Sequence, residues 1–228
     1  CIEESHVHVE PSGERAEVNG DILLKAFKVL EDFIGDDASR PWANGVLISG
    51  HSAFATCNVV LAEYWLGFGL PHVVNIPAQA IREVIRINEP PTHLQMDSNS
   101  ITFHYADGCW IRTQLFSTEW PDLSRVLNQA SNPTPIDERI FDALNKLKSF
   151  VDKTDKVIFT VGAVSTTVDD KEEGGHVDLP GSMMQGAYTR RMLMMLKGVA
   201  KEVDFSTYPQ PCMFFGDGVR GAILGRRL

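Results

Sequence analysis

The sequence predicts an α+β protein in which short amphipathic helices alternate with sets of strands joined by hairpin turns. The chain has 228 residues, of which 43% are hydrophobic and 22% are charged, as in soluble globular proteins. Four apolar stripes have the period of a helix, and each is followed by two or three strand-like runs. A doubly wound parallel sheet needs a helix after nearly every strand. Antiparallel sheets with helices on one side are therefore favoured.

The first half of the sequence predicts two units, each made of a strand, a helix and further strands. In the first unit the helix covers residues 21–34, its stripe is Leu23, Phe27, Leu30 and Ile34, and the strands are residues 14–18, 45–49 and 54–65. In the second unit Pro77 opens the helix, where a missing N–H costs nothing. Its stripe is Ile81, Val84 and Ile85, and its strands are residues 72–76, 93–96, 101–105 and 110–116.

Residues 120–135 contain three prolines, two asparagines and two serines, which predicts a connector. A third unit begins after it, with Asp137 as the expected N-cap. The stripe of its helix is Ile140, Leu144, Leu147 and Val151, and its strands are residues 157–161, 165–168 and, after a charged loop at 169–175, a return strand ending at Leu179.

The fourth unit completes the chain with a strand at residues 182–188 and a helix over residues 189–199. Its stripe is Met192, Met195, Leu196 and Val199, and its strands are residues 203–208, 212–215 and 219–224. Pairing the units in order predicts two domains. The first spans residues 1–127, including an unassigned N-terminal segment at 1–14, and the second spans residues 136–228 after a connector at 128–135.

Composition also excludes several classes of protein. No run approaches the roughly 18 apolar residues of a membrane span. Residues 1–10 are acidic and lack the apolar core of a signal peptide. The four cysteines are scattered and form no CxxC pair, so we expect a reduced, cytosolic chain without a metal site; they are Cys1, Cys57, Cys109 and Cys212.

Each predicted helix carries Lys or Arg on the side away from its apolar stripe, although the chain has a net charge of −9. These residues are Lys25, Lys28, Arg82, Arg86, Arg139, Lys146, Arg190, Arg191 and Lys197. On any single helix they are ordinary solvent-facing residues, and Asp32, Glu83 and Asp142 lie on the same faces. Their recurrence on four helices favours a surface that meets the phosphates of a polyanion without reading its sequence.

No group of residues in the sequence predicts catalysis. Residues 216–221 match GxGxxG, but a nucleotide-binding turn is followed by a helix, and the seven residues that remain predict a strand of a hairpin. His6 and His8 lie in an acidic terminus. The carboxylates of the charged loop, Asp169, Asp170, Glu172 and Glu173, lie around Lys171 in a solvated segment. We therefore expect no catalytic residue and no metal.

Several segments resemble the DNA sliding clamps of the bacterial type, the beta subunits of DNA polymerase III. NIPAQAIREVIRI at 75–87 is similar to a strand-into-helix segment of that family, and residues 98–127 are similar to its three strands with a closing Trp120-Pro121-Asp122. FATCNVVLA at 54–62 resembles a family strand, with Cys57, Asn58 and Val60 where Asp, Gly and Arg are usual. The end of the chain, residues 224–228, resembles the short clamp tail ending in Arg-Leu.

The resemblance implies a ring of six domains that encircles duplex DNA, with helices facing the hole and sheets forming the outer wall. Bacterial clamps reach six domains with two three-domain chains, so a two-domain chain implies a homotrimer of the phage type, in a bacterial or phage-infected cytoplasm. No cofactor is implied, since ATP would belong to a separate clamp loader. In this view the chain is a processivity factor and not an enzyme.

The resemblance also implies a pocket that binds short peptides of the polymerase and the clamp loader. The matching positions are Thr56, Asn58, Val59, Leu61, Val126, Leu127, Leu224, Gly225, Arg226 and Leu228. For Leu61, Val126 and Leu224, plain core packing explains the residue equally well. Two alternatives stay open for the whole chain: a metal-dependent enzyme acting on DNA, and a monomeric clamp-like adaptor that binds peptides only.

Overall fold

The computed structural model describes residues 10–117, 119–167 and 174–227, and four units with one order of elements follow one another along it. The first unit consists of β1 (Glu14–Glu17), α1 (Gly20–Leu30), β2 (Gly45–Ser49), β3 (Ser52–Thr56) and β4 (Val60–Trp65). The second consists of β5 (Val74–Pro77), α2 (Ala78–Ile87), β6 (His93–Met96), β7 (Ser100–His104) and β8 (Trp110–Gln114).

After the short helix α3 (Ser124–Leu127), the same order returns twice. The third unit consists of β9 (Thr134–Pro135), α4 (Arg139–Lys146), β10 (Lys156–Thr160), β11 (Ala163–Ser165) and β12 (His176–Asp178). The fourth consists of β13 (Gly186–Thr189), α5 (Arg190–Met194), β14 (Glu202–Val203), β15 (Cys212–Phe215) and β16 (Val219–Ile223). Short 3-10 turns lie at Glu31–Phe33, Pro41–Ala43, Leu147–Ser149 and Phe205–Thr207.

The opening strand of each unit pairs with the sheet of the other unit in its pair. Thus β1 joins β6 while β5 joins β2, and β9 joins β14 while β13 joins β10, all antiparallel. The exchange interlocks units one and two, and likewise units three and four. Neither unit of a pair keeps a complete sheet without the other.

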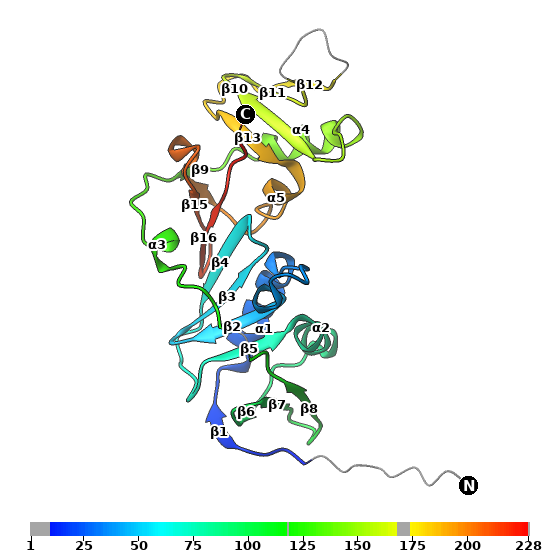
Figure 1. The fold of residues 1–228 in the computed structure, drawn as a ribbon, viewed down its shortest axis with the longest axis vertical. Helices are drawn as coiled ribbons and strands as arrows, with labels where there is room; N and C mark the ends of the chain where they lie inside the picture. Colours follow the sequence, from blue (N-terminus) through cyan, green and yellow to red (C-terminus); the bar gives the residue numbers. More distant parts are fainter. Residues whose placement is uncertain (1–9, 118, 168–173, 228) are drawn as a thin grey trace, which may run out of the picture.

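The two pairs of units share one sheet. Strands β4 and β16 are antiparallel over five residue pairs, from Val60 opposite Ile223 to Tyr64 opposite Val219. The result is an eight-stranded sheet in the order β5-β2-β3-β4-β16-β15-β14-β9, with the four-stranded sheets β1-β6-β7-β8 and β12-β11-β10-β13 beyond it. In Figure 1, β8 and β12 lie near opposite ends of an elongated molecule.

Helices α1, α2, α4 and α5 lie along one side of these sheets, at the right in Figure 1, while α3 lies on the opposite side. Their apolar stripes are buried as predicted at Leu23, Phe27, Leu30, Ile81, Val84, Ile140, Leu144, Leu147, Met192 and Leu196. Ile34, Ile85, Val151, Met195 and Val199 are only half-buried. Phe33 stacks on Phe214 with ring centroids 6.2 Å apart, so apolar packing also joins the two pairs of units.

Several predicted elements are wrong in their extent. The predicted strand 54–65 is two strands, because the chain reverses at Asn58, whose φ is +70°. The first helix ends at Leu30 instead of residue 34. The fourth helix ends at Met194 instead of residue 199. The turns that follow bond residues three apart, such as Leu196 N to Leu193 O (3.0 Å), and Gly198 has φ +75°.

The strands of the second pair also differ. β14 is only two residues long, because the Asp204 carboxylate accepts the backbone N–H of Ser206 (3.1 Å) and starts a 3-10 turn. The predicted strand 182–188 is β13, which begins at Gly186. The predicted strand 165–168 meets β11 only at Ser165, and its last residue lies outside the described residues, as do residues 169–173 of the charged loop. Asp137 precedes the N-cap Glu138, but its carboxylate still accepts the N–H of Arg139 (3.0 Å).

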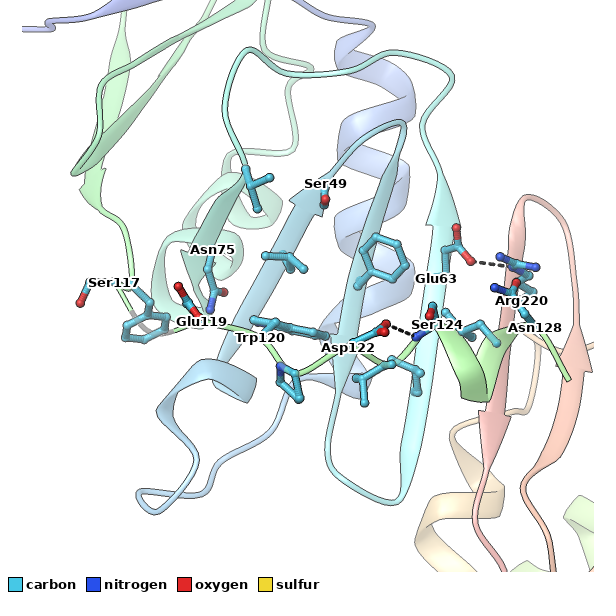
Figure 2. Close-up of a pocket in the computed structure, with 18 residues that line it drawn as sticks. Ser49, Glu63, Asn75, Ser117, Glu119, Trp120, Asp122, Ser124, Asn128 and Arg220 are labelled. Atoms are coloured by element: carbon cyan, nitrogen blue, oxygen red, sulfur yellow. Dashed lines mark hydrogen bonds and ion pairs between the residues drawn. The ribbon is translucent and has the colours of Figure 1, made fainter.

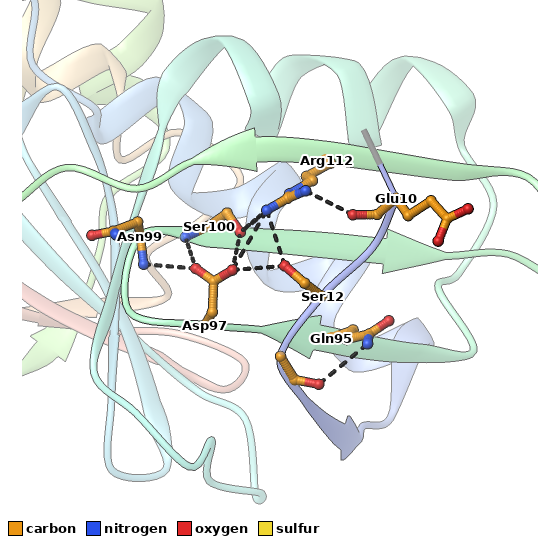
Figure 3. Close-up of polar contacts among 8 residues, drawn as sticks. Glu10, Ser12, Gln95, Asp97, Asn99, Ser100 and Arg112 are labelled. Carbon is orange, nitrogen blue, oxygen red and sulfur yellow. Dashed lines mark hydrogen bonds and ion pairs between the residues drawn. The ribbon is translucent and has the colours of Figure 1, made fainter. Parts of the chain in front are cut away.

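A polar cluster fastens the first described residues across the sheet of β1, β6, β7 and β8 (Figure 3). Arg112 on β8 donates to the Glu10 carbonyl (2.8 Å) and to Ser12 Oγ (3.1 Å). Asp97 accepts the backbone N–H of Asn99 (2.8 Å) and the Ser12 hydroxyl (2.9 Å). The Asn99 bond, followed by the bond from Ser12, lowers the pKa of Asp97 to about 2. The carboxylate therefore stays charged and keeps its partners at any ordinary pH.

None of the helices in the described residues has the length and apolar character needed to span a bilayer.

Two stacked histidines predict an acid-sensitive stability. His93 on β6 and His104 on β7 face each other with ring centroids 4.3 Å apart, and burial lowers both pKa values, with the neighbouring His93 adding to the effect at His104. The unfolded chain takes up these protons near pH 6.5. The contribution of the two neutral histidines to the free energy of unfolding is therefore fully present above about pH 6.5. It is lost as the pH falls toward their lowered pKa values in the folded protein.

The measurement is the urea midpoint of unfolding between pH 7.5 and 5. We expect the double variant His93→Phe/His104→Phe, which keeps the ring stack, to lose much of this dependence on pH. The control His51→Gln removes an exposed histidine elsewhere and should keep it. Equal slopes for all three proteins would contradict the assignment to the pair.

Candidate partner groove and basic helix surface

A groove lies on the outer side of the eight-stranded sheet, where β3, β4 and β16 meet the connector. Side chains alternate across a strand, so Phe54, Thr56 and Leu61 face this side while their neighbours face the helices. The groove contains a cavity of about 150 Å³, which we name the partner cavity. It is lined by Arg40, Trp42, Thr56, Asn58, Val59, Val60, Leu61, Leu123, Val126, Pro211, Ala222 and Leu224.

The reversal between β3 and β4 builds one wall of the partner cavity. The Thr56 hydroxyl donates to the Val60 carbonyl (2.8 Å) and accepts the backbone N–H of Asn58 (3.1 Å). Asn58 has φ +70°, a left-handed conformation that Gly and Asn adopt most readily. Asn is therefore suited to this position. The turn leaves Val59 half-buried at the cavity.

The connector forms the opposite wall. Asp122 accepts the N–H of Ser124 (2.9 Å), and the bonds from Ser124 lower the pKa of Asp122, so its carboxylate is charged where α3 begins. Val126 faces the partner cavity, while Leu127 is buried with Leu61. The helix thus holds one residue at the cavity and packs the next against the sheet.

The C-terminal tail passes the partner cavity and continues to the second pair of units. Leu224 donates its N–H to Val59 O (2.8 Å), and its side chain is 41% exposed at the cavity. Arg226 donates its N–H to Ala187 O (2.7 Å) and its guanidinium to Thr154 O (2.6 Å). A Cβ at Gly225 would lie 2.5 Å from the Tyr208 ring, so this position requires glycine.

Six of the ten residues expected in the pocket therefore line one cavity: Thr56, Asn58, Val59, Leu61, Val126 and Leu224. Leu127 lines the neighbouring cavity, Gly225 and Arg226 lie against the second pair of units, and Leu228 lies outside the described residues. The six other lining residues were not predicted: Arg40, Trp42, Val60, Leu123, Pro211 and Ala222. Trp42 and Pro211 come from loops distant in sequence, and no local pattern marks them.

A larger cavity of about 590 Å³ adjoins the first one and shares Leu61 and Leu123 with it (Figure 2). We name it the connector cavity, because residues 116–117, 119–124 and 127–128, which lead into and form part of the connector, line one side of it. The other side is the outer face of β2–β5 with Arg220 of β16. Its carboxylates are Glu63, Glu119 and Asp122, and Glu63 is paired with Arg220 at 2.5 Å. The sequence analysis did not predict this cavity.

Eight of the nine predicted basic residues are exposed on or beside the four helices. Arg190 is different: its side chain is 14% exposed and lies 2.9 Å from Asp155, so it is not on the open surface. Three more arginines form salt bridges with neighbouring carboxylates: Arg82 with Glu31, Arg86 with Glu83 and Arg139 with Asp137.

The remaining basic side chains of this set are available to a ligand. Lys28 donates to Asn88 Oδ1 (2.6 Å). Within the described residues, no hydrogen bond or ion pair occupies the side chains of Lys25, Lys146, Arg191 and Lys197. These residues are spread over α1, α4, α5 and the turn after α5, which lie on the same side of the molecule (Figure 1).

The other candidate motifs bring no further group of side chains together within the described residues. Residues 216–218 form the turn of the β15–β16 hairpin, as predicted for the GxGxxG match, and Gly218 has φ +72°. His6 and His8 lie outside the described residues. In the part of the chain that is described, no three His, Cys, Asp or Glu residues gather in a way that would hold a metal ion.

Comparison with known proteins identifies the fold through structure alone. No protein-family model matches the sequence, and no curated protein is similar to it in sequence. The sliding clamp of Bartonella birtlesii bound to griselimycin superposes with a TM-score of 0.81 at 14% identity, over 96% of this chain and 68% of the clamp. The DNA polymerase III beta subunit of Borrelia burgdorferi, in complex with a natural product, gives 0.81 at 13% identity, over 100% and 66%.

The beta clamp of Helicobacter pylori bound to a DNA ligase peptide gives a TM-score of 0.77 at 13% identity, over 96% of this chain and 67% of the clamp. The chain thus spans about two thirds of the length of these clamps. Its repeated units, its antiparallel sheets and its helices on one side are those of the α+β fold that the sequence predicts. The chain therefore has the fold of the bacterial DNA sliding clamps.

Proposed function

We propose that this protein is a sliding clamp, a processivity factor that encircles duplex DNA and holds a DNA polymerase to it. The observation that carries the proposal is the match of nearly the whole chain to bacterial clamps at TM-scores of about 0.8. Its action is topological and requires no cofactor and no catalytic residue. We place it in the cytoplasm of a bacterium or of a phage-infected cell, where the replicating DNA lies.

We propose that three copies close the ring. Two copies of a full-length clamp contain about as much chain as three copies of this one, which spans 66–68% of those clamps. The internal junction supports this: β4 and β16, the last strands of units one and four, pair edge to edge. The last strands of units two and three, β8 and β12, hold the equivalent edge positions in their sheets. We infer that β8 of one copy pairs with β12 of the next. The unpaired edge strands of each copy then form the joints of the ring.

The helix side would then face the DNA. Exposed Lys25, Lys146, Arg191 and Lys197 provide weak contacts to phosphates, which hold the duplex without stopping its movement. The rest of the acidic surface discourages DNA from binding outside the ring. The paired arginines contribute less, because their neighbouring carboxylates already compensate their charge.

We propose that the partner cavity binds short peptides of the polymerase and the clamp loader. Its apolar walls come from both pairs of units and from the connector, and a small concave apolar site with a few polar groups is typical of ligand recognition. The related clamp of Helicobacter pylori is bound to a DNA ligase peptide. A monomeric adaptor would share this cavity, and a DNA-cleaving enzyme would require divalent metal. The following measurements separate both from a clamp.

The ring predicts a particle of about three times the 25.3 kDa of one chain by light scattering. At β12, Gly175 O and Leu179 N bond toward β11, so the amides of His176 and Asp178 face the open edge. Asp178→Pro removes one of these donors and should give monomers that stay folded. The control Asp178→Asn keeps the backbone N–H of this residue and should stay trimeric. A wild-type particle of monomer mass would contradict the ring.

Encirclement predicts retention on DNA that depends on topology. Protein loaded on a nicked circle should stay bound through a high-salt gel filtration, and cutting the circle once should release it. Equal loss from circular and linear DNA would refute encirclement. Cleavage of the circle that requires added Mg²⁺ would favour the enzyme instead.

The basic helix surface predicts a charge effect confined to one side. The double variant Lys146→Glu/Lys197→Glu should bind duplex DNA several-fold more weakly at low salt, with a shallower dependence of affinity on salt, because fewer counterions are released. The control Arg125→Glu changes a residue of α3 on the opposite side (Figure 1) and should leave DNA binding nearly unchanged. A control that weakens binding as much as the double variant would place the DNA elsewhere.

The partner cavity predicts peptide binding that one substitution abolishes. We would measure fluorescence anisotropy of the labelled DNA ligase peptide bound by the Helicobacter pylori clamp. Val126→Glu places a charge at the cavity wall and should weaken binding more than tenfold. Arg191→Glu on the helix side should have no effect. A peptide that fails to bind the wild type, or that ignores Val126→Glu, would contradict this site.

A further inference from the structure

We propose that the connector cavity is a second subsite for the same partner chain, and that it takes an extended peptide segment carrying Lys or Arg. The proposal rests on the peptide-binding function proposed above and adds the chemistry of what must flank the peptide in the partner cavity. Three independent observations support it: the continuity of the two cavities, two buried polar atoms without partners, and the charge of the lining.

The two cavities are parts of one groove. Leu61 of β4 and Leu123 of the connector line both of them, so the two cavities adjoin at these side chains. The connector cavity, at about 590 Å³, is roughly four times larger than the partner cavity at about 150 Å³. It falls in the size range of ligand sites. A peptide anchored by a few apolar side chains in the small cavity therefore has a larger space beside it.

Two polar atoms at the connector cavity have no hydrogen-bond partner within the described structure. Asn75 is 5% exposed and donates from its amide nitrogen to Trp42 O (2.9 Å), but its Oδ1 accepts nothing. The Trp120 Nε1–H likewise donates to nothing. In Figure 2, Asn75 comes from β5 of the sheet and Trp120 from the connector. Unsatisfied buried polar atoms are costly, and a peptide backbone offers the N–H and the C=O that they lack.

Trp120 is held in a way that permits a peptide to enter. Its ring meets Trp42 edge to face, with centroids 5.3 Å apart and planes at 67°. That contact and the apolar neighbours of the connector fix the ring, and its polar atom holds no bond that movement would break. A shift of the indole therefore costs packing only and exposes a donor for the incoming chain.

The lining selects the charge of the occupant. Arg220 is bonded to Glu63, which also accepts the Ser52 hydroxyl (2.7 Å), so this pair is neutral within itself. Arg125 of α3 lies close enough to Asp122 to help lower its pKa, whereas no ion pair holds Glu119 within the described residues. Apolar side chains, among them Phe54 and the 64% exposed Val73, form the rest of the surface. Apolar walls with the unpaired carboxylate of Glu119 repel a polyanion and favour an apolar segment with a basic residue.

The test uses the DNA ligase peptide bound by the Helicobacter pylori clamp as a common core. Four synthetic derivatives extend the core by Ala-Lys-Ala-Lys or by Ala-Glu-Ala-Glu, at the N-terminus or at the C-terminus. We expect one of the two Lys extensions to bind the full wild-type chain about fivefold or more tightly than the core, a gain of the size given by one or two partly exposed charge pairs. Neither Glu extension should gain.

Variants locate the gain. Glu119→Lys should abolish the gain of the Lys extension while changing the affinity of the core less than twofold. The matched control Glu89→Lys makes the same charge change at an exposed site outside both cavities and should keep the gain. Ser49→Trp fills the connector cavity from β2 and should also remove the gain, whereas Ser49→Ala leaves the space open and should retain it.

The outcomes separate the two proposals. A core that binds normally with no advantage for either Lys extension overturns the second subsite and leaves the partner cavity standing. An advantage that survives both Glu119→Lys and Ser49→Trp also overturns it, since the added charge then binds elsewhere. A core that does not bind the wild type overturns the proposed peptide function and this inference with it.

Discussion

The backbone hydrogen bonds between β4 and β16 carry the structure across the middle of the chain. Residues 60–64 meet residues 219–223, more than 150 positions away, and their pairing turns two separate sheets into one of eight strands. The outer groove exists only because of this contact. Thr56 and Val59 come from one side of the junction, and Ala222 and Leu224 from the other. A slip of one residue in this register would turn Leu61 from the groove toward the helices.

Strand exchange within each pair of units explains why four small units make a stable protein. A helix on a three-stranded sheet leaves an edge with unmatched N–H and C=O groups, which invites misassembly. In this chain the opening strand of the neighbouring unit covers one edge of each sheet, and β4–β16 covers two more. β1, β5, β9 and β13 still end their sheets, as do β8 and β12. β8 and β12 lie near the two ends of the molecule (Figure 1), where extending their sheets requires a second chain.

The helical stripes and most strands were predictable because their residues follow the period of the element that they form. The fold class followed from that pattern, and the resemblance at residues 54–62, 75–127 and 224–228 supplied the clamp architecture and half of the residues that line the partner cavity. The errors have local physical causes. Asn58 reverses a run that reads as one strand, and Asp204 ends a strand by capping a 3-10 turn. Arg190 looked solvent-facing because Asp155, which binds it, lies 35 residues earlier. Trp42 and the connector cavity depend on tertiary contacts that no window of sequence contains. The domain limits at residues 127 and 136 stay a prediction.

The C-terminal tail links the two pairs of units beside the partner cavity. Leu224 is bonded to the turn of the first pair of units and Arg226 to β13 of the second, so three residues span the junction beside the cavity. Any ligand that fills the cavity touches both sides of this span, and its affinity must depend on the angle between them. By thermodynamic linkage the reverse holds as well: an occupied cavity restricts that angle. In the proposed ring, a peptide bound in the partner cavity would therefore help to set the curvature of the assembly.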